Sequence, residues 1–155
     1  MPADVRIRPA RRDEADALTA LAIRSKASWN YPAAWLEQWA EELAFDPAYL
    51  SAHRVRVAET GGALAGVLAL EERPEGWELE RVWVDPSAQG LGVGRALVDD
   101  ALAHAARVRR GNVTVLSDPH AEAFYRRLGA TRIGETPAPM PGAPNRALPR
   151  LAFRL

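Results

Sequence analysis

The residues best suited to chemistry in this sequence are three glycines placed two positions apart, Gly90, Gly92 and Gly94. Glycine has no side chain, so the backbone N–H groups of such a loop stay open to a ligand. A run rich in Ala and Leu with helical spacing follows directly, and the first N–H groups of a helix are unpaired and attract negative charge. The stretch therefore predicts a binding site for a phosphate or pyrophosphate group.

Two common phosphate-binding motifs do not fit this loop. The dinucleotide-binding pattern GxGxxG requires a glycine where this chain has Arg95, and a P-loop requires Gly-Lys followed by Ser or Thr. The single lysine, Lys26, lies far from the glycines. From the residues alone, a coenzyme-binding loop and a plain glycine-rich turn between a strand and a helix remain equally open interpretations.

A second stretch with chemical potential begins at Asp118. Asp118 and Pro119 suit the N-cap and the first position of a short helix, and Gly129 suits its end. Phe124 and Tyr125 lie on the apolar face of that helix. A buried phenol needs a polar partner, so Tyr125 is a candidate functional group as well as a candidate core residue.

Together the two stretches resemble the GNAT superfamily of acyl-CoA-dependent N-acyltransferases. Gln89, Gly92 and Gly94 match the coenzyme A loop of that family, Gln/Arg-x-x-Gly-x-Gly/Ala, after a strand that ends Val-Asp-Pro. The second stretch matches another family signature, although Asp118 replaces the commoner Asn and Ala130 the commoner Phe. The resemblance implies a mixed α+β fold, with a central, mostly antiparallel sheet of about seven strands flanked by about four helices. It also implies acetyl-CoA as co-substrate, no metal, and acetyl transfer to a primary amine of a small molecule by direct attack in a ternary complex.

The resemblance also implies roles for individual residues. Tyr125 matches the tyrosine that protonates the thiolate leaving group. The backbone of residues 82–84 resembles the strand segment that pairs with the pantetheine arm and directs an N–H group at the thioester carbonyl. The positions implied in cofactor binding are Val82, Trp83, Val84, Gln89, Gly90, Leu91, Gly92, Val93, Gly94, Arg95, Asp118 and Phe124.

A general base must remove a proton from the acceptor amine. Glu80 lies on the strand before the loop, where several members of the family carry a catalytic Glu, and Glu78 shares its face by strand alternation. The alternative is that either carboxylate is exposed or pairs with Arg73 or Arg81. Burial beside aromatic residues would raise the pKa of a glutamate towards the operating pH, as a base requires.

Aromatic residues gather around the break between the first two expected helices. Trp29 and Tyr31 lie in this polar break and are candidates for a small-molecule pocket, with Glu78 as a third substrate residue. Core packing is an equal alternative for both aromatic residues, and it is the main expectation for Trp35 and Trp39, which fall at helical spacing. The acidic residues around Glu78 favour a cationic acceptor.

The elements that must position these residues follow from the apolar periodicity. Helical spacing predicts helices after an Asp13 N-cap, from Pro32 onward, over 94–106, and after Asp118. A proline-rich loop is expected over 137–149. Alternating or β-branched apolar residues predict strands at 5–8, 53–59, 63–71, 77–84, 112–116, 131–135 and 150–155.

The composition argues against several other classes of protein. The length of 155 residues suits one domain, expected over 1–155. The chain has no cysteine and only 3 scattered histidines, so neither disulfides nor a metal site is expected. It has no apolar run of membrane-spanning length, no signal-peptide core and no basic stripe, so a cytoplasmic protein without membrane or nucleic-acid partners is expected.

Three further points stay open at this stage. A domain of this kind without turnover would bind acyl-CoA as a sensor. A protein or peptide N-acetyltransferase would need an open groove instead of an aromatic-walled pocket. Dimers are common in the family, so a homodimer stays open as well, and no stretch of the sequence marks an interface.

Overall fold

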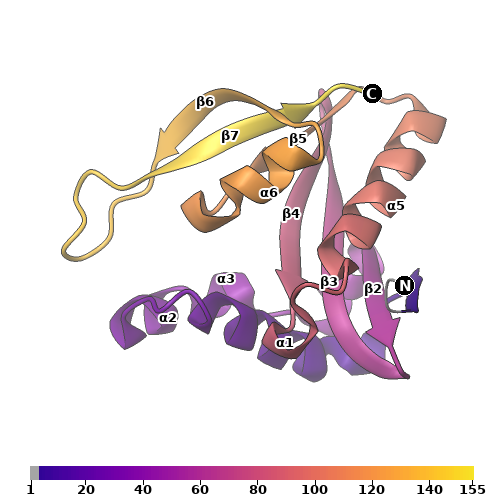
Figure 1. Cartoon of the computed structure of the whole chain (residues 1–155), viewed down its shortest axis with the longest axis horizontal. Helices are drawn as coiled ribbons and strands as arrows, with labels where there is room; N and C mark the ends of the chain where they lie inside the picture. The colour runs from indigo at the N-terminus through magenta and orange to yellow at the C-terminus, as the bar shows by residue number, and fades with distance from the viewer. Residues whose placement is uncertain (1–3) are drawn as a thin grey trace.

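A seven-stranded sheet forms the centre of the computed structural model, which describes residues 4–155 (Figure 1). The strands are ordered β1-β2-β3-β4-β5-β7-β6, and neighbours run antiparallel except for β4 and β5, which are parallel. The mixed α+β fold with a mostly antiparallel sheet, predicted from the sequence, is confirmed. The strands are β1 (Val5–Pro9), β2 (Arg54–Thr60), β3 (Ala63–Arg73), β4 (Gly76–Val84), β5 (Asn112–Leu116), β6 (Thr131–Pro137) and β7 (Ala147–Phe153).

The described residues form more helices than the roughly four that the sequence predicted. Two apolar cores lie between the helices and the sheet, one under α5 and one under α1–α4. The second expected helix is interrupted at Trp39, and a further short helix begins at Pro47 after an Asp46 N-cap. Within residues 4–155, none of the helices combines the length and apolar character needed to cross a bilayer. The helices are α1 (Ala15–Ala27), α2 (Ala33–Gln38), α3 (Ala40–Leu43), α4 (Pro47–Ala52), α5 (Val93–Val108) and α6 (Glu122–Arg127).

β4 and β5 diverge in the middle of the sheet. They pair only over residues 76–79 of β4 and 112–115 of β5. In Figure 1, β5, β6 and β7 lean away from β4, and α6 lies with them. The last residues of β4, 80–84, therefore have a strand neighbour on the β3 side only.

A β-bulge at Glu80 changes the direction of the side chains in this part of β4. Leu79 pairs with Leu70, whereas Arg81 pairs with Ala69, so β4 has one residue more than β3 at this point. A bulge of this kind re-aims neighbouring side chains. The bulge lies within a run of four consecutive residues, 78–81, that all line one pocket.

Most strands keep their predicted bounds to within about two residues, but the start of the first helix and the start of β7 differ from the sequence prediction in ways that matter for the fold. The first helix begins at Ala15 and is not capped by Asp13, because a 3-10 turn precedes it in which Glu14 accepts the backbone N–H of Arg11 at 2.8 Å. β7 begins at Ala147, so the proline-rich loop between β6 and β7 covers residues 138–146 only. The first change follows from a hydrogen bond between residues three positions apart, and the second from the pairing of β7 with β6.

Candidate functional site

The glycine-rich loop exposes its backbone to an open space. Gly90 and Gly92 have φ angles of +79° and +80°, in the left-handed region that residues with side chains rarely adopt. A Cβ atom added at either position would meet no atom within 4 Å. α5 begins directly afterwards at Val93, so its first unpaired N–H groups lie beside the same space.

A pocket of about 390 Å³, named here the loop pocket, connects this loop with α6 and the end of α1. Trp83, Leu91 and Asp118 lie outside its lining, although the sequence analysis grouped them with the cofactor residues. The structure brings the other predicted cofactor residues together in its wall, namely Val82, Val84, Gln89, Gly90, Gly92, Val93, Gly94, Arg95 and Phe124.

A second pocket of about 320 Å³, named here the central pocket, lies across β4 from the loop pocket. Val82 and Val84 line the loop pocket, whereas Arg81 and Trp83 line the central pocket, as expected for alternating side chains of a strand. The free end of β4 thus forms a wall that the two pockets share.

Tyr125 is buried in the wall of the loop pocket with 5% of its surface exposed. Its ring packs edge-on against Phe124 and Phe153, with centroid distances of 5.1 and 6.4 Å. Burial raises the pKa of the phenol well above its ordinary value, and the negative charge of Asp118 adds to the effect. Tyr125 is therefore protonated at neutral pH, and its side chain forms part of the wall of the loop pocket.

Glu80 and Glu78 both line the central pocket. The Glu80 side chain is 39% exposed, and partial desolvation by the surrounding residues raises its pKa; neighbouring carboxylates raise it further, while Arg73 donates to Glu80 at 2.9 Å and opposes them. Glu78 accepts from Thr114 at 2.8 Å and from Arg150 at 3.0 Å. Pairing with Arg73, one of the two arginines named in the alternative, thus occurs at Glu80, whereas Glu78 pairs with Arg150, which the alternative did not name. Glu80 nevertheless retains the raised pKa that suits a general base.

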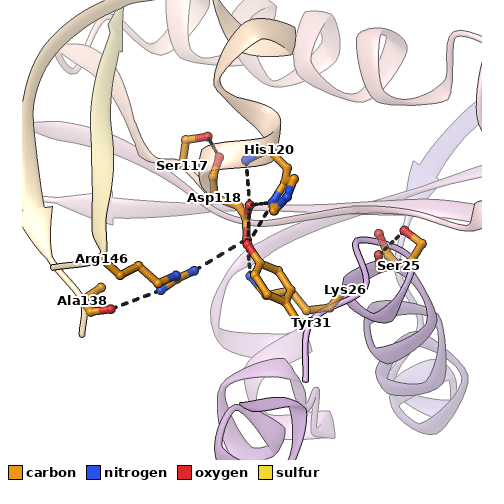
Figure 2. Close-up of polar contacts among 9 residues, drawn as sticks. Ser25, Lys26, Tyr31, Ser117, Asp118, His120, Ala138 and Arg146 are labelled. Carbon is orange, nitrogen blue, oxygen red and sulfur yellow. Dashed lines mark hydrogen bonds and ion pairs between the residues drawn. The ribbon is translucent and has the colours of Figure 1, made fainter. Parts of the chain in front are cut away.

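Asp118 is the centre of a buried polar cluster (Figure 2). Lys26 donates to Asp118 Oδ2 at 2.6 Å, the Tyr31 hydroxyl donates to the same oxygen at 2.8 Å, and the backbone N–H of His120 donates to Oδ1 at 2.8 Å. Burial alone would raise the pKa of Asp118, but the Lys26 ammonium and these hydrogen bonds hold it below its ordinary value. Asp118 is therefore an anion that ties α1 to the segment after β5.

Aromatic rings enclose the two cations of this cluster. Lys26 Nζ lies 4.4 Å from the ring centroid of Trp39 and 5.2 to 5.6 Å from those of three further rings. Arg146 lies 5.1 Å from the Trp39 ring and 5.7 Å from the Tyr31 and Trp35 rings. Burial lowers the pKa of Lys26, and Asp118 opposes that shift.

Neither of the two aromatic residues predicted for the substrate pocket, Trp29 and Tyr31, lines the central pocket. Trp29 stacks on His120, with ring centroids 5.4 Å apart, and lines the loop pocket. Tyr31 lines neither pocket and instead holds Asp118, whereas Trp39, expected mainly in the core, lines the central pocket.

Sequence reasoning missed Lys26 and Arg146. The only sequence signal for Lys26 was a single lysine at the polar, aromatic-rich break after the first helix. Arg146 belongs to a loop of irregular structure, where no periodicity indicates the direction of a side chain. Within residues 4–155, no three His, Asp or Glu side chains are grouped closely enough to hold a metal ion.

Comparisons with known proteins agree with this geometry. Residues 20–130 match the acetyltransferase (GNAT) family. The chain is 32% identical over 116 residues to the mycothiol acetyltransferase of Geodermatophilus obscurus, a match that covers 72% of this chain but only 33% of that protein.

Two solved structures share the fold over nearly the whole length of both chains. A GCN5-related N-acetyltransferase of Rhodopseudomonas palustris superposes with a TM-score of 0.82 at 20% identity, covering 100% of this chain and 98% of its own. The PaiA N-acetyltransferase of Thermoplasma acidophilum, in complex with coenzyme A, has a TM-score of 0.75 at 15% identity and covers 98% of this chain and 99% of its own. The family match, which spans most of the chain and both signature stretches, shows that this chain belongs to the acetyltransferase (GNAT) family of acyl-CoA-dependent N-acetyltransferases.

Proposed function

We propose that this chain transfers the acetyl group of acetyl-CoA to a primary amine of a small-molecule acceptor by direct attack in a ternary complex. The observation that carries the proposal is the pair of pockets that share the free end of β4. One contains the glycine-rich loop and Tyr125, and the other contains Glu80. Donor and acceptor molecules in these pockets would meet at residues 80–84.

The loop pocket fits the phosphates and the arm of coenzyme A. The open backbone at Gly90 and Gly92 and the start of α5 suit a pyrophosphate, and Arg95 and Arg127 in the lining add positive charge. The unpaired side of residues 82–84 offers N–H and C=O groups to the amides of the pantetheine arm. When bound, acetyl-CoA supplies the activated acetyl thioester.

In this proposal Glu80 accepts the proton of the acceptor ammonium, directly or through water. Its raised pKa brings proton transfer closer to neutral pH than an ordinary glutamate allows. Tyr125 is protonated at neutral pH and donates a proton towards the leaving sulfur, whose developing negative charge draws the proton from the phenol. The enclosing aromatic residues Trp39 and Trp83 limit water around the acceptor.

Thiol release from acetyl-CoA, measured against a panel of amines, amino acids and peptides, tests the proposal beside a direct measurement of acetyl-CoA binding. We expect release that requires a small primary amine and falls strongly in Glu80→Gln. Glu72→Gln is the matched control, because that carboxylate is exposed on β3 and lines neither pocket.

Each other result has a different meaning. Binding without release for every acceptor would favour an acyl-CoA sensor. Release with peptides alone would favour a peptide N-acetyltransferase. A protein that does not bind acetyl-CoA at all would refute the proposal.

A further inference from the structure

Two cations and one anion share the buried cluster beside the central pocket. The side chains of Lys26, Asp118 and Arg146 are exposed to only 11%, 7% and 11%. Lys26 Nζ lies 2.6 Å from Asp118 Oδ2, whereas Arg146 Nη2 lies 3.9 Å from the same oxygen. The carboxylate is therefore committed to Lys26, and the cluster carries an excess positive charge on Arg146.

The other carboxylates of the central pocket do not neutralise this charge. Glu78 pairs with Arg150 at 3.0 Å, and Glu80 pairs with Arg73 at 2.9 Å, both partners coming from outside the pocket lining. Glu42 also lines the pocket and its charge acts on Lys26, raising the pKa of that residue, but Glu42 is exposed on α3 and forms none of the ion pairs found within residues 4–155. A buried cation without a close counter-ion is costly unless a ligand or ordered solvent completes it.

Arg81, the third cation of the pocket lining, is already occupied. Its guanidinium donates to the backbone carbonyl of Ala44 and lies 4.1 Å from the ring centroid of Tyr49. Arg146 also contacts a backbone carbonyl and aromatic rings, but the charge of Arg81 acts on the neighbouring Glu80, whereas the carboxylate nearest to Arg146 is Asp118, which already binds Lys26. Arg146 is thus the cation of the pocket that remains for an anionic ligand.

The guanidinium of Arg146 is held in a fixed place and has more N–H donors than hydrogen-bond partners. A guanidinium has five N–H donors, whereas the one hydrogen bond of the Arg146 side chain found within residues 4–155 goes to the Ala138 carbonyl at 3.3 Å; its other neighbours are the Tyr31, Trp35 and Trp39 rings and the Asp118 oxygen at 3.9 Å. Trp35 anchors the same loop by donating from Nε1 to the Pro141 carbonyl at 3.0 Å. Figure 2 shows Arg146 reaching from this loop towards Asp118.

We propose that the acceptor of this enzyme carries an anionic group beside its amine, a carboxylate in the simplest case, and that Arg146 binds this group. The inference rests on the proposed function, because Arg146 and Glu80 line the same central pocket. The acceptor then spans the pocket, with its anion at Arg146 and its amine towards Glu80. A pocket of about 320 Å³ suits a molecule of amino-acid size.

Matched pairs of acceptors test the proposal, each pair differing only in the anionic group. Amino acids are compared with their amides, and phosphoethanolamine with ethanolamine, so that carboxylate and phosphate are distinguished. We expect kcat/KM to be about 10- to 100-fold higher for the anionic member, the usual effect of a charge-assisted hydrogen bond. A preference confined to one of the two pair types identifies the anion.

Variants of Arg146 then connect this preference with the residue. Arg146→Gln should reduce the ratio within each pair to about one, and Arg146→Lys should restore part of it, since a lysine keeps the charge but not the planar fork. Arg132→Gln is the control, because that arginine lies on β6 outside both pockets and should leave the ratio unchanged.

Binding of the same pairs, read from tryptophan fluorescence, does not require turnover and separates this inference from the proposed function. Thiol release with equal kcat/KM for both members of every pair would overturn the inference and leave the proposed function standing. Without thiol release, tighter binding of the anionic members that is lost in Arg146→Gln would still support it. Equal binding of both members, or no binding of either, would overturn it.

Discussion

Removing the charge of Asp118 tests the buried cluster most directly. Asp118→Asn keeps the shape of the side chain but leaves Lys26 without its close counter-ion. Loss of one partner from a buried ion pair lowers the free energy of unfolding by about 3–5 kcal/mol. The pair with Lys26 has a 2.6 Å contact and side chains only 11% and 7% exposed, so solvent screens it little and the full range applies.

Urea unfolding of single and double variants separates the charge from the packing. Lys26→Met removes the cation and keeps an apolar chain among the aromatic rings, so the double variant Lys26→Met/Asp118→Asn should be more stable than the sum of the two single losses predicts. In thermal unfolding, a loss of about 3–5 kcal/mol corresponds to a shift of about 6–20 °C for a chain of this size.

Asp13→Asn provides the control for this cycle. Asp13 pairs with Arg11 at 3.1 Å, but both side chains are more than half exposed, so the stability should change by less than about 0.5 kcal/mol. A wild-type urea midpoint for Asp118→Asn, or strictly additive losses in the double variant, would refute the reasoning about the buried pair.

Three further predictions concern the two pockets and the cluster. Tyr125→Phe should lower kcat by about 100-fold or more, while the affinity for acetyl-CoA, measured by calorimetry, stays close to wild type. An unchanged kcat would exclude the acid role of Tyr125. Gly92→Ala should weaken acetyl-CoA binding and destabilise the fold by about 1–2 kcal/mol, because alanine is strained at a φ of +80°; equal affinity would show that the loop backbone does not hold the phosphates. The pKa of Asp118 is lower in the folded than in the unfolded chain. Its stabilising effect is therefore fully present above the ordinary value of 3.8 and disappears as the pH falls through the folded pKa. In urea titrations at progressively lower pH, the stability difference between wild type and Asp118→Asn should vanish.

The sequence predicted those parts of the site whose geometry is local. Three glycines followed by a helical run specify a turn and a helix start within a few residues, and the loop pocket contains all three. In the same way, Asp118 followed by Pro119 specifies a helix start, and the 3-10 turn that leads into α6 begins there. Neither feature needs a partner distant in the chain.

The parts that the sequence did not predict depend on long-range contacts. Lys26 and Asp118 are 92 positions apart, and neither residue type indicates that a partner exists. The bulge at Glu80 arises from the pairing of β4 with β3, and no glycine or proline marks it within β4. The division of the second expected helix at Trp39 likewise follows from packing, since Trp39 is buried in the core under α1.

The divergence of β4 from β5 leaves an exposed strand edge within the sheet instead of at its outer boundary. Unpaired N–H and C=O groups along such an edge readily pair with any extended chain that reaches them, including a second copy of the protein. A ligand bound along residues 80–84 would cover this edge. We therefore expect acetyl-CoA to protect the protein against aggregation on heating as well as to raise its melting temperature, and light scattering recorded with and without the ligand will measure the protection.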